Sequence, residues 1–186
     1  MALTPTTTLE LGFKAPDFTL PEPLTGKTRR LQDLRGEQAT LIVFMCNHCP
    51  YVTHVIDQII SLAHDYAPRG LRLIAINAND VENYPEDSPA KMSAWAEALQ
   101  FPFPYLFDES QAVTKAYDAA CTPDFSLFDQ DLICRYRGRL DGSRPKNNVP
   151  STGQDLRAAL DCLLDGQAIT EPQLPSMGCN IKWKKA

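Results

Sequence analysis

The sequence predicts a mixed α/β sandwich, a sheet of parallel and antiparallel strands with helices on both faces. Two continuous apolar runs, Ala39–Met45 and Leu71–Ile76, are typical of strands that are buried on both sides. A segment with helical spacing of apolar residues follows each run, and this alternation predicts parallel strands. A strand–turn–strand pattern over residues 125–136 adds an antiparallel hairpin.

The N-terminal part of the chain predicts a hairpin before the first buried strand. A short strand at Lys14–Leu20 leads to a turn at Gly26-Lys27, and Thr28–Arg30 returns. After Ala39–Met45, a helix is expected to run to about Tyr66. Its buried face follows from apolar residues at helical spacing, namely Val52, Val55, Ile56, Ile59, Leu62, Ala63 and Tyr66.

The rest of the chain predicts three further helices, a short strand and a tail. Ser88-Pro89 begins a second helix, because proline is favoured in the first helical turn. The other expected elements are a strand over 104–107, helices over 111–117 and 152–164, and a proline-rich tail from Asp165. We expect the tail to fold back over the body of the protein, since Ile181 and Trp183 carry apolar surface that burial would stabilise.

Composition excludes several classes of function. The 186 residues are 44% hydrophobic, contain no internal repeat, and predict one domain over 1–186. A net charge of −5 without a basic patch argues against nucleic-acid binding. The longest apolar run is too short to span a bilayer, and residues 1–10 do not resemble a secretory signal. We therefore expect a cytoplasmic protein with no membrane partner.

The segment Cys46-Asn47-His48-Cys49 lies between a buried strand and a helix, and it indicates redox chemistry. Unpaired N–H groups at a helix N-terminus stabilise a thiolate, and an imidazolium at His48 would lower its pKa further. A thiolate can attack a disulfide, after which the second cysteine resolves the mixed intermediate. We therefore expect His48 to make the Cys46–Cys49 disulfide more oxidising.

A metal site is the competing interpretation of this motif. Structural zinc sites with this spacing need a second cysteine pair, whereas Cys121, Cys134, Cys162 and Cys179 are scattered singly. A copper or zinc carrier that uses Cys46, Cys49 and His48 is the least favoured alternative. We expect no metal and no bound cofactor.

Several segments together resemble the thioredoxin-fold redoxins, specifically the peroxiredoxin-like branch of the alkyl hydroperoxide reductase/thiol-specific antioxidant superfamily. The matching segments are Ala15–Leu20, Gly26-Lys27, Leu31–Gly36, the Cys46/Cys49 pair, Thr122-Pro123 and Gly178–Trp183. The resemblance implies a thioredoxin fold with an N-terminal hairpin and a C-terminal tail. It also implies an oxidoreductase with an antioxidant role.

The resemblance permits two assignments of the pair. In thioredoxins the first cysteine is the exposed nucleophile, here Cys46, and Thr122-Pro123 would supply a cis-proline facing the pair. In peroxiredoxins Cys49-Pro50 would be the peroxidatic Cys-Pro, but Cys46 then occupies the place of a peroxide-binding threonine. Dithiol exchange is therefore the favoured hypothesis, and thiol peroxidase is the alternative.

The expected partners follow from that hypothesis. The substrate would be a disulfide-containing protein, a small thiol or a peroxide, and a separate reductase system would re-reduce the enzyme. Cys121 should approach the site as a third redox thiol or, preferably, as a buried hydrophobe. Cys179 could resolve a disulfide or simply pack.

The remaining candidates are assigned mostly to packing or solvent. Cys134 should lie in the core on the same strand face as Leu132 and Tyr136, and Cys162 beside the apolar stripe of the last helix. His54 and His64 are expected to face solvent or the flank of their helix. Arg139 and Arg144 could bind a peroxide, although solvated loop arginines are the default interpretation. Asp80 could carry protons, although a solvated loop carboxylate is the favoured interpretation.

Overall fold

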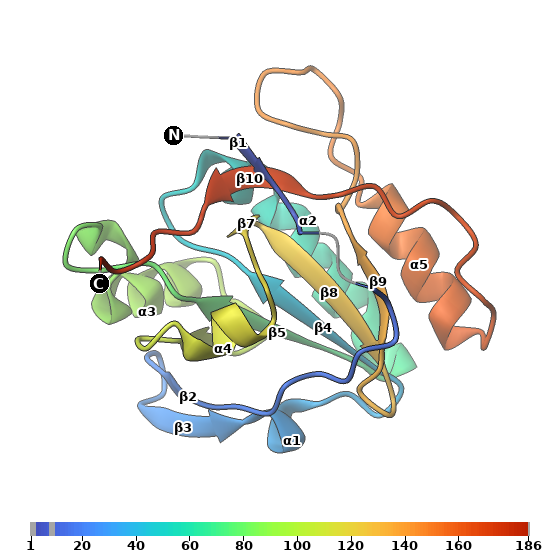
Figure 1. Cartoon of the computed structure of the whole chain (residues 1–186), viewed down its shortest axis with the longest axis horizontal. Helices are drawn as coiled ribbons and strands as arrows, with labels where there is room; N and C mark the ends of the chain where they lie inside the picture. Colours follow the sequence, from blue (N-terminus) through green and yellow to red (C-terminus); the bar gives the residue numbers. More distant parts are fainter. Residues whose placement is uncertain (1–2, 8–9, 186) are drawn as a thin grey trace.

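A computed structural model describes residues 3–7 and 10–185, and within them a five-stranded mixed sheet forms the centre of the fold (Figure 1). Strand β4 is central, pairing in parallel with β5 and antiparallel with β8. Strand β6 extends the parallel side, and β9 extends the antiparallel side. In spatial order the strands are β6 (Tyr105–Phe107), β5 (Leu71–Asn77), β4 (Ala39–Phe44), β8 (Asp124–Asp129) and β9 (Cys134–Gly138). The predicted mixed α/β architecture is confirmed.

Helices and a hairpin cover the two faces of this sheet. One face packs against α2 (Pro50–Tyr66), α3 (Pro89–Ala98) and α5 (Gln154–Leu164). The other face packs against the short helix α1 (Leu31–Leu34), the segment after α4 (Ala112–Ala116), and β2 (Thr19–Glu22) of the predicted hairpin, which pairs with β3 (Lys27–Arg30). Two 3₁₀ turns, η1 (Ala67–Arg69) and η2 (Pro85–Asp87), end α2 and precede α3.

Alternating side chains of β4 enter the two hydrophobic layers. Leu41 and Val43 face the layer formed with α2, whereas Ile42 and Phe44 face the layer beneath the N-terminal hairpin. All six residues of β4 are buried, as the continuous apolar run predicts. Because β4 and β5 are parallel, their C-terminal ends meet at the same edge of the sheet. Polar residues follow both strands at this edge.

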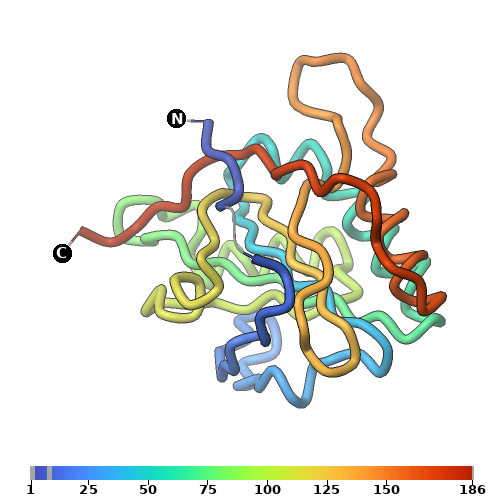
Figure 2. The backbone as a smooth tube through the Cα atoms, turned by 45° about the vertical axis from the view of Figure 1, so that its right-hand side comes forward, coloured from blue at the N-terminus to red at the C-terminus, as the bar shows by residue number. Residues whose placement is uncertain are grey.

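The C-terminal tail forms a strand that the sequence did not predict. Residues Met177–Asn180 form β10, which lies between β1 (Leu3–Pro5) and β7 (Cys121–Thr122) in a separate antiparallel sheet. The tail leaves α5 and crosses the molecule beside the N-terminal strand (Figure 2). The predicted docking of the tail is confirmed.

The contacts of the tail differ from those expected. Ile181 is buried, but Trp183 remains 39% exposed and lies against Lys115, whose Nζ is 5.5 Å from the ring centroid. Backbone pairing in β10 therefore contributes to docking, together with the burial of Ile181.

The prediction that Leu132, Cys134 and Tyr136 share one face of a strand is wrong for Tyr136. Cys134 and Leu132 lie in the layer below the sheet, whereas Tyr136 lies in the opposite layer. A register irregularity opposite Leu127/Phe128 pairs Cys134 and Tyr136 with adjacent residues of β8, so Arg135 is bulged out. An extra residue in a strand reverses the alternation of side chains that follow it.

Among the described residues, no helix has both the length and the apolar character needed to cross a membrane.

We predict that Gly178→Ala weakens the attachment of β10. A Cβ at this position would overlap the backbone carbonyl of Thr122, so the strand would have to shift. The expected loss of stability is about 1–3 kcal/mol, with faster amide hydrogen exchange in β10 and β7. Gly142→Ala is the matched control, because its methyl group would meet the Arg139 guanidinium at 3.6 Å, an ordinary contact distance. Equal exchange rates in the two variants would contradict this account of the strand.

Candidate active site

The two cysteines of the motif lie where the central strand leads into α2. Cys46 is in the connecting loop, and Cys49 is the N-cap residue of α2, followed by Pro50 in the first turn. The predicted placement at a helix N-terminus is confirmed. The expectation that Cys46 is exposed is wrong, because Cys46 and Cys49 are only 1% and 0% exposed.

Thr122 brings β7 against both thiols. The Thr122–Pro123 peptide bond is cis, as predicted. Cys46 Sγ lies 3.6 Å from Thr122 Oγ1, and the Cys49 thiol, when protonated, donates to the Thr122 carbonyl oxygen at 3.1 Å. The residue before the cis-proline therefore faces the pair.

The two thiols differ in their preference for the charged form. Hydrogen bonds from the Cys46 thiol, Thr122, and the thiol and backbone N–H of Cys179 lower the pKa of Cys49. The pKa of Cys46 is raised, first because its thiol is the donor to Cys49, and also by burial and by the negative charge of Asp87. The hydrogen bonds from Cys46 and Cys179 therefore favour the thiolate on Cys49.

Asp87 is a site residue that the sequence analysis missed. Its carboxylate is buried and accepts the backbone N–H of Asn47 at 2.8 Å and that of His48 at 3.3 Å. Its other oxygen lies 2.6 Å from His48 Nδ1 and accepts Asn79 Nδ2 at 2.8 Å. Asp87 therefore holds the loop that carries the cysteines.

A sequence signal for Asp87 was available. Loops that follow adjacent parallel strands meet at the same edge of a sheet, so the polar loop after β5 had to approach the loop after β4. Asp80, the residue named from that loop, has a local role. Its carboxylate accepts the N–H of Glu82 and the side-chain amide of Asn83 within its own turn.

His48 lies between Asp87 and the solvent. Its ring stacks on Tyr84 with the centroids 5.6 Å apart and the planes 7° from parallel. A ring nitrogen of His48, a carboxylate oxygen of Asp87 and Cys46 Sγ lie within 4.8 Å of one another. The charge of Asp87 opposes the thiolate, whereas an imidazolium would favour it. The effect of His48 on the redox potential therefore stays a prediction.

The same three residues offer sulfur, nitrogen and oxygen atoms that a metal ion accepts. Both carboxylate oxygens of Asp87, however, are already engaged by hydrogen-bonding groups from Asn47, His48 and Asn79. A metal ion at Cys46 would have to displace the contact with His48. The arrangement therefore fits a proton-carrying network better than a metal centre.

The other cysteines occupy different environments. Cys179 contacts Cys49 directly and is 2% exposed. Cys121 points to Thr6 and to the Pro123 carbonyl, and burial raises its pKa. Cys134 is buried in the layer beneath the sheet, where burial raises its pKa to about 12, and Cys162 is partly exposed on α5. Of the four, Cys179 is the thiol that contacts the pair.

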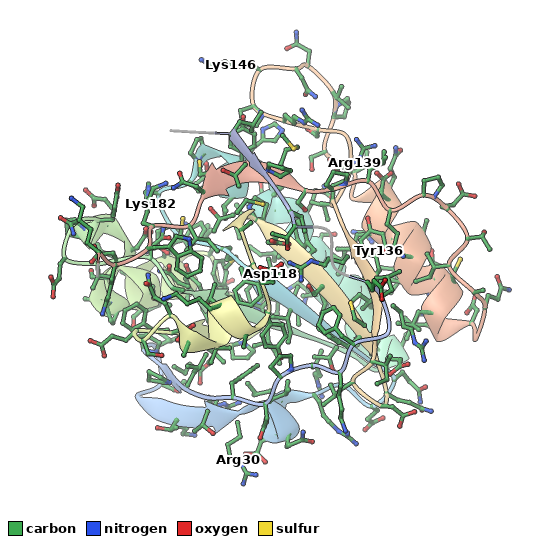
Figure 3. All side chains as sticks on the ribbon, viewed as in Figure 1. Arg30, Asp118, Tyr136, Arg139, Lys146 and Lys182 are labelled. Carbon is green, nitrogen blue, oxygen red and sulfur yellow. The ribbon has the colours of Figure 1, made fainter. Side chains whose placement is uncertain are left out.

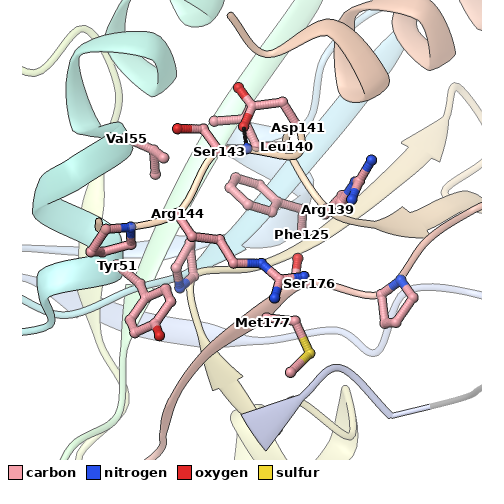
Figure 4. A pocket seen from close by; sticks show the side chains of 13 residues that line it. Tyr51, Val55, Phe125, Arg139, Leu140, Asp141, Ser143, Arg144, Ser176 and Met177 are labelled. Carbon is pink, nitrogen blue, oxygen red and sulfur yellow. Dashed lines mark hydrogen bonds between the residues drawn. The ribbon is translucent and has the colours of Figure 1, made fainter. Parts of the chain in front are cut away.

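A pocket lies beside the pair, between the first turns of α2 and the loop over 139–152 (Figure 4). Tyr51, which follows Cys49-Pro50 in the sequence, and Pro123, which follows Thr122, form one side of this pocket. Arg144 extends across the pocket in Figure 4. Arg139 lies at the base of the loop, where its Nε pairs with Asp155 at 2.6 Å, and Lys146 lies near its tip (Figure 3).

The two remaining histidines lie away from the pair. His54 and His64 are exposed on α2, as expected, and His54 Nε2 contacts Ser143 Oγ at 2.7 Å.

Comparison with known proteins agrees with this geometry. Residues 11–137 match the AhpC/TSA family. A protein from Mycobacterium tuberculosis named "Putative peroxiredoxin" is 29% identical over 117 residues, which cover 63% of this chain and 69% of that protein.

Solved structures confirm the fold. The crystal structure of an uncharacterized conserved protein from Geobacillus kaustophilus is 54% identical, with a TM-score of 0.97 over 100% of this chain and 98% of that chain. A solution structure from Neisseria meningitidis, named "Putative Thioredoxin", is 24% identical, with a TM-score of 0.62 over 81% of this chain and 89% of that chain. The expected thioredoxin fold is therefore confirmed.

We predict that Asp87→Asn lowers the pKa of Cys46. The carboxylate opposes a negative charge on Cys46, so its removal favours the thiolate and moves the rise in alkylation rate to lower pH. The measurement is the pH dependence of iodoacetamide labelling at Cys46 in a Cys49→Ser background, with an expected shift of about one pH unit. Asp80→Asn is the control and should leave the profile in place. A shift to higher pH in Asp87→Asn would contradict the role assigned to this charge.

Proposed function

This chain belongs to the AhpC/TSA family of redox enzymes, and we propose from that premise that it is a thiol–disulfide oxidoreductase. The dithiol Cys46/Cys49 would be its reactive group. The observation that carries this proposal is the convergence of both thiols on Thr122, the residue before the cis-proline. The opposite directions of their pKa shifts agree with one nucleophile and one resolving thiol. A pair of this kind has the nucleophile and the resolving group of disulfide exchange in place.

The exchange has two steps. The Cys49 thiolate attacks a substrate disulfide, forms a mixed disulfide and releases one substrate thiolate. Cys46 then loses its proton and attacks Cys49 Sγ, which forms the Cys46–Cys49 disulfide and releases the second substrate thiolate. The two departing thiolates take up protons, and the enzyme has lost two electrons to the substrate.

The His48–Asp87 pair is suited to receive the proton of Cys46. A ring nitrogen of His48 lies within 4.8 Å of Cys46 Sγ, and Asp87 fixes the ring through Nδ1. We assign His48 as the proton acceptor and Asp87 as the residue that positions it.

A substrate would approach the buried thiols from the side of Tyr51 and Pro123, where the pocket itself has a volume of only about 30 Å³. Arg144 extends across this pocket and would provide a cation for an anionic group. The substrate in this proposal is a disulfide of a protein or of a small thiol, and a separate reductase would re-reduce the enzyme. Such chemistry suits the cytoplasm, where thiols are kept reduced.

Thiol peroxidase activity is the second candidate, and one observation favours it. The lowered pKa of Cys49, which precedes Pro50, is the property that a peroxidatic cysteine needs. A peroxide would oxidise Cys49 to a sulfenic acid, and Cys46 would condense with it to form the same disulfide and water. The two candidates share the product and differ in the oxidant.

The proposed function predicts that Cys49 is required for reduction of a peptide disulfide driven by dithiothreitol. Cys49→Ser should fall to the uncatalysed rate, because it removes the nucleophile of the first exchange step. Cys46→Ser should be slower than the wild type, because it removes the thiol that resolves the mixed disulfide in the second step. Cys162→Ser removes a partly exposed thiol from α5 and should retain the wild-type rate.

Parallel assays with hydrogen peroxide separate the two candidates. Thiol–disulfide exchange predicts turnover with the peptide disulfide and little consumption of peroxide. Rapid peroxide consumption with no disulfide turnover would instead identify the protein as a peroxidase. Disulfide turnover that persists in Cys49→Ser would overturn the assignment of the nucleophile.

A further inference from the structure

The tail strand β10 places a third thiol against the reactive pair. In the three-stranded sheet, Cys179 is opposite Leu3 of β1 on one side and Thr122 of β7 on the other. Thr122 is the residue that both thiols of the pair contact. Cys179 therefore reaches the site from a segment far away in the sequence.

Cys179 contacts Cys49. The thiol and the backbone N–H of Cys179 both hydrogen-bond to Cys49. Burial raises the pKa of Cys179, and the hydrogen bond to Cys49 and the Cys49 charge raise it further. Cys49 also receives the Cys46 thiol. Cys46 and Cys179 thus both donate to Cys49.

Both ends of the tail strand are fixed to the body of the protein. Before β10, the Ser176 carbonyl accepts the N–H of Thr6 at 2.9 Å, and the Ser176 hydroxyl donates to the Gly138 carbonyl at 3.1 Å. After β10, the Lys182 N–H donates to Asn79 Oδ1 at 2.8 Å, and the Lys182 carbonyl accepts Gln111 Nε2 at 2.9 Å. Cys179 is therefore held in place.

The approach of β10 is close enough to require a glycine next to Cys179. A side chain at Gly178 would overlap the Thr122 backbone, as noted for the overall fold. Cys179 itself belongs to the same buried cluster as Cys46 and Cys49. Strand pairing and burial, independently of the pKa values, thus bring this thiol to the pair.

We propose that Cys179 is a third redox thiol, which exchanges with Cys46 for a disulfide bond to Cys49. The proposal rests on the proposed function, since it starts from the Cys46–Cys49 disulfide. Deprotonated Cys179 attacks Cys49 Sγ, the Cys49–Cys179 bond forms, the Cys46–Cys49 bond breaks, and Cys46 leaves as a thiolate that takes up the proton. The number of electrons is unchanged, so no external oxidant or reductant takes part.

The exchange would have a structural consequence. A Cys49–Cys179 bond ties β10 covalently to the start of α2 while Cys46 becomes a free thiol again. The same contact allows Cys179 to resolve a mixed disulfide on Cys49 when Cys46 is absent. That second reaction can be tested in isolation.

The test uses the full chain with Cys46→Ser and glutathione disulfide as the probe. The Cys49 thiolate should form a glutathione adduct, and Cys179 should then displace glutathione, which leaves an internal Cys49–Cys179 disulfide. Peptide mapping by mass spectrometry without reduction should identify this bond. Cys46→Ser/Cys179→Ser should instead retain the glutathione adduct on Cys49.

A second buried cysteine provides the control. Cys46→Ser/Cys134→Ala also loses a buried thiol from a strand, and it should form the Cys49–Cys179 bond as Cys46→Ser does. In oxidised wild-type protein, a measurable fraction of Cys46 should accept an alkylating agent, and this fraction should fall to zero in Cys179→Ser.

The outcomes separate this proposal from the proposed function. A lasting glutathione adduct, or free thiols at Cys49 and Cys179, in Cys46→Ser would overturn the exchange with Cys179. If the wild-type protein still forms Cys46–Cys49 in that case, the two-cysteine mechanism stands. A wild-type protein that forms no Cys46–Cys49 disulfide would instead overturn the proposed function.

Discussion

The hydrogen bonds that converge on Cys49 Sγ are the interaction on which the arrangement of the site depends. A buried negative charge is costly unless donors surround it, and Cys49 is fully buried. Its donors come from three separate parts of the chain: Cys46 in the loop after β4, Thr122 in β7, and Cys179 in β10. The central sheet, the turn before Pro123 and the C-terminal tail must all be in place for the thiolate to be stable.

The same arrangement makes the two sulfurs unequal. Cys46 donates to Cys49 and faces the charge of Asp87, so its pKa rises while that of Cys49 falls. The two sulfurs together thus favour one proton and one negative charge. The first step of disulfide exchange requires a thiolate of this kind. His48 connects this pair to the partly exposed surface, since its ring lies between Asp87 and Tyr84.

Much of the fold could be predicted from local patterns. The apolar run of β4 and the stripe along α2 place Cys46 and Cys49 correctly, because strand and helix periodicity are local properties. The strand β10 could not be predicted in this way, because its four residues gain stability by pairing with β1 and β7. Predicting that Asp87 reaches the cysteine loop required knowing that β4 and β5 are neighbours in the sheet. Local sequence patterns indicate the order of strands only indirectly.

The errors at the site have the same origin. The resemblance to thioredoxins implied an exposed Cys46, but the loops that cover it come from elsewhere in the chain. Ile181 and Trp183 were both expected to anchor the tail. Ile181 does so together with strand pairing, whereas Trp183 stays partly exposed. Side-chain type indicated which residues matter, whereas long-range contacts determined how they act.

The most direct test of the account is a redox titration of the wild-type protein in dithiothreitol buffers, with differential alkylation of each cysteine. The account predicts that Cys46 and Cys49 become protected at the same potential in one two-electron transition, with the fraction of Cys46 that stays free matched by protected Cys179. A tenfold change in the equilibrium constant of this transition corresponds to about 30 mV. Cys121 and Cys134 should remain reduced throughout, because Cys121 points to Thr6 and the Pro123 carbonyl and Cys134 is buried in the opposite layer of the core. Independent titration of Cys46 and Cys49, or no protection of either across the range, would contradict the central claim that they form one redox-active pair.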